Sequence, residues 1–205
     1  MKERIILALL WLSIAAVPAM AQEKLYPVTS RSDVPVLMNA DRSAFVAEKI
    51  GYKLTLGPAD DDRTTFLPAT RGRVIILWCR VENLTDQTLQ VNIEKFTMMD
   101  GEGRAYRMLT NDETTDRVIA GAGGASALLS KTLHGVSLGR TGKFTEEQVK
   151  EDVVRYSLKP GQIPSHGVKD GLLYFDAPPA KNYTVNVTLG DLWSKPFVFS
   201  TTKPK

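Results

Sequence analysis

Apolar and polar residues alternate along several short segments after residue 50, and this period of two constrains the fold more than any other feature. The clearest example is 182–189, which reads Asn-Tyr-Thr-Val-Asn-Val-Thr-Leu. Residues 50–56 alternate in the same way and end at Gly57-Pro58. Such alternation is typical of β-strands with one buried face. About seven segments of this kind, separated by turn residues, predict a mainly β protein with an antiparallel sandwich of two sheets.

The segment 73–82 differs because its first half is apolar on both faces. One face carries Ile75, Leu77, Cys79 and Val81, and the other carries Val74, Ile76 and Trp78. A strand that is apolar on both faces is covered on both sides. The second face becomes polar at Arg80 and Glu82. We therefore expect something to cover Val74 to Trp78 and to leave Arg80 and Glu82 open.

The alternation is interrupted over 109–157, which we interpret as a partly helical insertion in a sandwich that spans 50–201. A helix is predicted over 145–156, where Thr145 and Gln148 form a capping box. Val149, Val153 and Tyr156 give this helix one apolar stripe. A further short helix is expected at 126–133. We expect the insertion to fold over Val74, Ile76 and Trp78, since both partners have an apolar face without another obvious cover.

Two further segments are interpreted from local pattern. The apolar phase slips at Glu94-Lys95, which predicts a bulge inside a strand over 88–98. Residues 22–49 are expected to form an N-terminal arm, extended over 26–35 and with one short helix over 41–49 that Asp41 would cap.

Residues 1–21 have the pattern of a secretory signal peptide. Lys2 and Arg4 precede an apolar run from Ile5 to Val17, and Ala19-Met20-Ala21 resembles a cleavage site. The run is about 13 residues long, whereas a membrane span needs roughly 20. We therefore expect a periplasmic or secreted protein with no stable membrane span after signal removal.

Composition narrows the classes of partner. The chain has 26 Lys and Arg against 23 Asp and Glu, a formal charge of +3, and no concentrated basic segment, so we expect no nucleic-acid partner. The single cysteine, Cys79, lies in an apolar run. It is expected to be a small buried hydrophobic residue, with a reactive thiol or an intermolecular disulfide as alternatives.

Several motifs resemble those of a bacterial extracytoplasmic domain family of unknown function. They are Arg80-Val81-Glu82-Asn83 after a hydrophobic strand, Phe96 to Gly101 with Tyr106, Leu158-Lys159-Pro160-Gly161, and Gly171 to Phe175 with Pro178. This family is similar to a secreted mycobacterial immunoprotective antigen. The resemblance covers roughly 50–108 and 158–199. It implies an immunoglobulin-like β-sandwich outside the cytoplasm and supplies no catalytic residues.

Candidate chemical groups are few. A hydrolase-like enzyme would use His134 or His166 under the insertion, although the Gly-x-Ser-x-Gly elbow is not found. A periplasmic metal carrier would use these histidines with Met98, Met99 or Met108, soft ligands that suit copper. Asp60-Asp61-Asp62 lacks the spacing of a calcium loop. We therefore predict no cofactor and no resident metal.

The favoured function is that of an exported, non-enzymatic binding or protein-interaction module of the cell envelope. Its partner would be an unknown envelope protein or a small ligand. Sandwich loops or an exposed edge strand would make the contact. The candidate loops are 57–70 and 99–104, and the candidate contact residues are Arg104, Tyr106 and Trp193.

Overall fold

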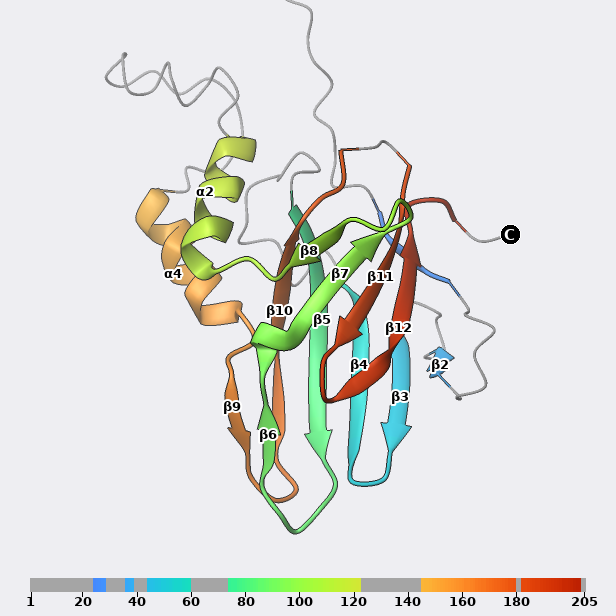
Figure 1. Ribbon diagram of the computed structural model, residues 1–205. Helices are drawn as coiled ribbons and strands as arrows, with labels where there is room; N and C mark the ends of the chain where they lie inside the picture. Colours follow the sequence, from blue (N-terminus) through green and yellow to red (C-terminus); the bar gives the residue numbers. More distant parts are fainter. Residues whose placement is uncertain are drawn as a thin grey trace, which may run out of the picture.

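The computed structural model describes residues 24–28, 36–38, 44–59, 74–122, 145–179 and 182–203. These residues form two five-stranded antiparallel sheets, a two-stranded sheet and two α-helices (Figure 1). The first sheet has, in spatial order, β1 (Tyr26–Pro27), β12 (Trp193–Ser200), β11 (Thr184–Leu189), β7 (Phe96–Asp100) and β8 (Ala105–Arg107). The second has β10 (Val168–Asp176), β5 (Val74–Asn83), β4 (Tyr52–Pro58), β3 (Phe45–Lys49) and β2 (Val36–Met38). The expected antiparallel sandwich is confirmed, and its immunoglobulin-like character stays a prediction.

The main core lies between the two sheets and follows the alternation of the sequence. On β11 the buried residues are Val185, Val187 and Leu189, as the pattern predicts. One face of β5, which includes Leu77 and Cys79, packs into the same core. Phe45 of β3 packs against two rings of β12, with ring centroids 5.6 Å from Phe197 and 5.2 Å from Phe199.

A second core lies on the outer face of the second sheet, under the helices α2 (Asn111–Ala122) and α4 (Glu146–Tyr156). It contains Val74, Ile76, Leu109, Val118, Val149, Val153, Leu172 and Tyr174, with Trp78 half-buried at its margin. Figure 1 shows both helices beside β10 and β8, at one end of the sandwich. The prediction that the insertion covers Val74, Ile76 and Trp78 is confirmed. Beyond this cover, Arg80 and Glu82 are half-buried and form an ion pair at 3.1 Å.

Helix α4 forms where the sequence predicts it. The Thr145 hydroxyl accepts the Gln148 amide at 3.1 Å, and the Gln148 side chain accepts the Thr145 amide at 3.0 Å. Val149 and Val153 are its buried residues, while Tyr156 is exposed. The helix expected at 126–133 lies outside the described residues.

Helix α2 is not predicted by the sequence analysis, although it also starts with a capping box. The Thr110 amide donates to the Glu113 carboxylate at 2.9 Å, and the Glu113 amide donates to the Thr110 hydroxyl at 3.3 Å. Arg107 pairs with the same carboxylate. These contacts hold the start of α2 against the end of β8.

Two local predictions are wrong. Residues 45–49 are strand β3, not part of a helix, because Phe45 and Ala47 enter the main core and the segment pairs with β4. The phase slip at Glu94-Lys95 is a 3-10 turn over Ile93–Lys95, capped by the Asn92 side chain, and not a bulge. This turn separates β6 (Leu89–Val91), which pairs with β9 (Gly161–Ile163), from β7, which pairs with β11.

The Arg107–Glu113 contact makes the stability of α2 depend on pH. Hydrogen bonds from Arg107, and then from the Thr110 amide, lower the pKa of Glu113 from 4.5 to about 2. A lowered carboxyl pKa contributes stability above pH 4.5, and this contribution is lost as the pH falls toward 2. We expect Glu113→Gln to lower the free energy of unfolding by about 0.5 to 1 kcal/mol at pH 7.

The measurement is urea unfolding of both proteins at several pH values. The difference between wild type and Glu113→Gln should shrink as the pH falls from 5 to about 2. Asp116→Asn changes an exposed carboxyl on the same helix and should leave the curve near that of the wild type. A difference that stays constant across this range would contradict the proposed ionic cap.

Candidate functional site

The residues proposed for contact from the sequence do not come together. Arg104 and Tyr106 lie in the β7–β8 hairpin, where they organise a turn. The Asp100 carboxylate accepts the Arg104 amide at 2.9 Å and the Tyr106 hydroxyl at 2.9 Å. Trp193 lies two strands away, with 6% of its surface exposed, and its ring centroid is 6.0 Å from that of Phe197. In this structure Tyr106 closes a turn and Trp193 fills the core.

Electrostatics support the turn-closing role of Asp100. Burial alone would raise the pKa of Asp100, but hydrogen bonds from the Arg104 amide and the Tyr106 hydroxyl outweigh it and lower that pKa. The pKa of Tyr106 is raised by burial and by the hydrogen bond to Asp100. The carboxylate and the neutral phenol therefore stabilise each other, which keeps the hairpin formed at neutral pH.

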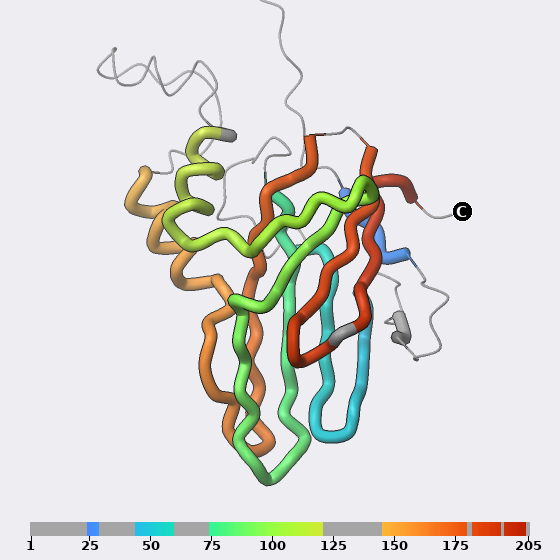
Figure 2. The backbone as a smooth tube through the Cα atoms, viewed as in Figure 1, coloured from blue at the N-terminus to red at the C-terminus, as the bar shows by residue number. Residues whose placement is uncertain are grey.

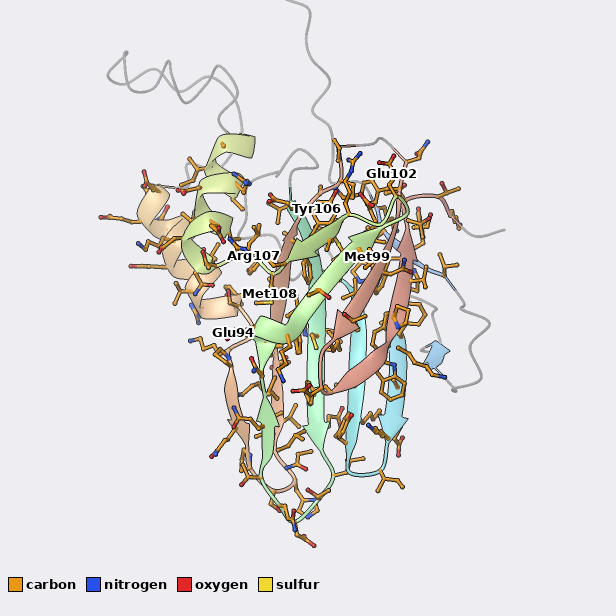
Figure 3. All side chains as sticks on the ribbon, viewed as in Figure 1. Glu94, Met99, Glu102, Tyr106, Arg107 and Met108 are labelled. Carbon is orange, nitrogen blue, oxygen red and sulfur yellow. The ribbon has the colours of Figure 1, made fainter. Side chains whose placement is uncertain are left out.

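The other predicted groups are scattered as well. Met98 is fully buried, Met99 is 47% exposed, and Met108 packs against the main core. Figure 3 labels Met99 and Met108. His134 and Asp60-Asp61-Asp62 lie outside the described residues. Within the part of the chain that the structure describes, no three His, Cys, Asp or Glu side chains are grouped as a metal site would require.

Cys79 is fully buried in the main core, as expected of a small apolar residue. Burial, with a smaller contribution from Asp170, raises the pKa of the Cys79 thiol to about 12. A buried neutral thiol is a poor nucleophile. We expect alkylation of the native protein at pH 8 to be at least about a hundredfold slower than in the unfolded chain. Fast native labelling, followed by mass spectrometry, would contradict this burial.

The most organised group of loops lies at the end of the sandwich away from the helices. We call it the Asn83 loop end, and it consists of residues 50–51, 83–88 and 164–168. Figure 2 shows the three chain reversals side by side at the foot of the molecule. Backbone hydrogen bonds join them: the Leu84 amide donates to the Gly51 carbonyl at 2.8 Å, and the Asn83 amide donates to the Gly167 carbonyl at 2.9 Å.

Asn83 is the centre of this loop end, and its side chain is buried, with 2% of the residue exposed. Its amide nitrogen donates to the carbonyls of Gln87, Ile163 and Pro164, at 2.6, 3.2 and 2.9 Å. Its side-chain oxygen accepts the Thr85 amide at 3.1 Å and the Thr85 hydroxyl at 2.8 Å. One side chain therefore fixes two loops that are about 80 residues apart in sequence.

His166 belongs to the same loop end. Its Nε2 lies 3.0 Å from Asp86 Oδ1, and its backbone has a left-handed φ of 54°. Both side chains are open to water, with 65% and 97% of their surface exposed. The carboxylate of a hydrolase triad is buried. We therefore interpret this pair as a bridge between two loops.

Exposed apolar side chains gather on the Asn83 loop end. Among the described residues, six large hydrophobic side chains are exposed, and three of them are here: Ile50, Leu84 and Val168. Ile50 is 102% exposed at the tip of the β3–β4 hairpin. Gly51, with a φ of 100°, meets the backbone requirement of that turn. The fold therefore gives no reason for an isoleucine at position 50.

Comparison with known proteins adds no identity. No family model matches the sequence, and no curated protein matches it. The yjhA protein from Bacillus subtilis aligns with a TM-score of 0.31 at 13% identity, covering 74% of this chain and 78% of that one. The ycdA protein from the same species aligns with a TM-score of 0.33 at 14% identity, covering 72% of this chain and 35% of that one. A functionally unknown protein from Listeria monocytogenes aligns with a TM-score of 0.32 at 11% identity, covering 83% of this chain and 77% of that one.

The resemblance to the extracytoplasmic family stays a prediction, and the structure gives its motifs a physical meaning. Asn83, Asp100 and Gly171 are each needed where two segments of chain meet.

In the described residues, no helix has the length and apolar composition needed to cross a membrane.

Proposed function

We propose that the chain is an exported, non-enzymatic interaction module of the bacterial cell envelope, and that the Asn83 loop end contacts a protein partner. The signal-peptide pattern of residues 1–21 supports export. The observation that carries the contact surface is the group of exposed Ile50, Leu84 and Val168 on loops that are already fixed by hydrogen bonds. We favour this surface over Tyr106 and Trp193, whose side chains have roles within the fold, and over Arg104, whose exposed side chain pairs with Glu102.

Two physical effects make this loop end suited to binding. Burying the three apolar side chains would contribute on the order of 5 kcal/mol. Loops that are ordered before binding avoid the entropy cost of being ordered by the partner. The Asn83 hydrogen bonds provide this order. The exposed Asp86–His166 pair would lie at the polar rim of the contact, where such groups give orientation more than affinity.

The test begins with a photo-crosslinking amino acid at position 50, in cells that produce the full-length chain. A matched control carries the same group at Val154, which is exposed on α4 far from the loop end. We expect one defined envelope protein to crosslink through position 50 and not through position 154. Equal products from both positions would contradict the proposal.

Binding to the crosslinked protein is then measured with purified components. Ile50→Asp and Leu84→Asp are each expected to weaken binding by at least about tenfold, since a desolvated carboxylate would replace an apolar contact. Val154→Asp should bind like the wild type. All three substitutions fall on exposed side chains, so thermal unfolding should confirm that each variant stays folded. Unchanged affinity in both loop-end variants would reject this surface.

A further inference from the structure

The outer face of the first sheet carries fewer charged residues than the outer face of the second sheet. The outward residues of β7 and β11 are Thr97, Met99, Thr184, Asn186 and Thr188, and none is charged. On the outer face of the second sheet, by contrast, opposite charges stand side by side: Glu82 is paired in register with Lys53, and Arg80 with Asp170. A face of paired charges is typical of a solvated surface. The first sheet lacks that pattern.

Three ion pairs lie at the margins of this face, and Lys195 is a half-buried charged residue of β12. Lys95 pairs with Asp191 at 2.6 Å, beyond one end of β7. Glu102 pairs with Arg104 at 2.5 Å, beyond the other end. Arg107, on β8, is held by Glu113 of α2. A centre depleted of charge within a charged rim is the composition of protein interfaces, in which methionine is also enriched.

One row of residues crosses the whole face and is nearly symmetrical in chemistry. Register places Ala105, Met99, Asn186 and Val198 side by side on β8, β7, β11 and β12 (Figure 3 labels Met99). The Val28 amide donates to the Val198 carbonyl at 2.8 Å and extends the row to the far edge. Asn186 is therefore central, with two apolar residues on each side of it.

We propose that this face binds a second copy of the chain, forming a symmetric dimer of sheet packed on sheet. A two-fold axis in the interface beside Asn186 places the row of one copy over the row of the other. Apolar side chains then meet apolar side chains, and the two Asn186 amides can exchange hydrogen bonds. A self-complementary contact requires a face that does not repel itself, and an uncharged face meets that condition.

The size of the face sets the strength of the dimer. Five strands about 4.8 Å apart, with five residues at about 3.4 Å each, give a flat footprint of roughly 400 Å². This footprint is smaller than the roughly 800 Å² per partner that a standard stable interface buries. The dimer should therefore dissociate on dilution, with a Kd on the order of micromolar to a few hundred micromolar.

Sedimentation equilibrium of the mature chain, over a concentration range that reaches about 1 mM, tests this proposal. Met99→Lys and Val198→Lys, on either side of Asn186, are each expected to raise the Kd of the dimer at least about tenfold, because each buries a charge. Met99→Leu keeps the apolar contact and should dimerise like the wild type. Val154→Lys adds the same charge to α4 and should have no effect on the dimer.

Two results would overturn the proposal. The first is a wild-type chain that stays monomeric over the whole concentration range. The second is a dimer that persists in both lysine variants, which would place self-association on another face. Neither result bears on the Asn83 loop end, whose residues are not part of this face.

Discussion

Replacing Asn83 by alanine is expected to lower the free energy of unfolding by about 3 kcal/mol, because several buried polar groups lose their partner at once. The amide donates to three carbonyls, two of which belong to the chain around residues 163–164. The side-chain oxygen also accepts two hydrogen bonds from Thr85. With 2% exposure, water cannot easily replace these contacts. The loop end should become mobile even where the sandwich stays folded.

Urea unfolding followed by tryptophan fluorescence measures this loss, and Asn182→Ala provides the matched control. Asn182 is the same residue type in an exposed position, so its replacement should change stability by less than about 0.5 kcal/mol. Asn83→Asp replaces the donor with a buried carboxylate oxygen that faces three carbonyl oxygens, so it should be at least as destabilised as Asn83→Ala. An Asn83→Ala protein as stable as the control would show that the hydrogen bonds are not needed.

Gly171→Ala is the second substitution with a large expected effect, although it adds a single methyl group. A Cβ at position 171 would lie 2.5 Å from the backbone nitrogen and Cα of Leu158. This is where the chain leaving α4 crosses β10, with the Leu158 amide donating to the Leu172 carbonyl at 2.9 Å. Backbone atoms cannot rotate away as a side chain can. We expect a loss of about 3 kcal/mol, through separation of this crossing from the sheet.

The matched control for this prediction is Gly101→Ala. A Cβ at position 101 would find its nearest neighbour, the Thr184 carbonyl oxygen, at an ordinary contact distance of 3.9 Å. Hydrogen exchange should show faster exchange of the Leu158 amide in Gly171→Ala and native protection in Gly101→Ala. Equal stability of Gly171→Ala and Gly101→Ala would contradict a backbone crossing this close.

The strands that the sequence predicts well are those in which burial alone decides the pattern. β11 alternates because one face enters the core, and β5 is apolar on both faces because helices cover its outer side. Helix α4 is predicted because Thr145 and Gln148 form a capping box next to an apolar stripe. In each case the local signal and the tertiary environment agree.

Helix α2 shows where that agreement fails. Its buried face includes Thr114 and Thr115, whose hydroxyls donate to the carbonyls of Thr110 and Asn111 at 2.8 Å. Because these buried polar side chains form hydrogen bonds within the helix, the sequence of α2 lacks a clear apolar periodicity. The Thr110–Glu113 capping box was a signal from which the helix could have been predicted. For β3, pairing with β4 overrides the local preference of the segment.

The candidate site was harder to predict than the fold. Ile50, Leu84 and Val168 are far apart in sequence and lie at the same end of the sandwich only because the register of β4, β5 and β10 brings the ends of these strands together. Asn83 reads in the sequence as a turn residue, and its contacts with residues 163 and 164 depend on the tertiary structure. Alternation assigned Ile50 to a buried strand face, whereas it lies at an exposed turn.

The measurement that bears most directly on a preformed contact surface is amide hydrogen exchange at the Asn83 loop end of the free protein. The amides of Asn83, Leu84 and Thr85 all donate within this loop end. We predict that they exchange at least about a hundredfold more slowly than in an unfolded chain, and that Asn83→Ala removes this protection at Thr85. Exchange at the unfolded rate in the wild-type protein would contradict it.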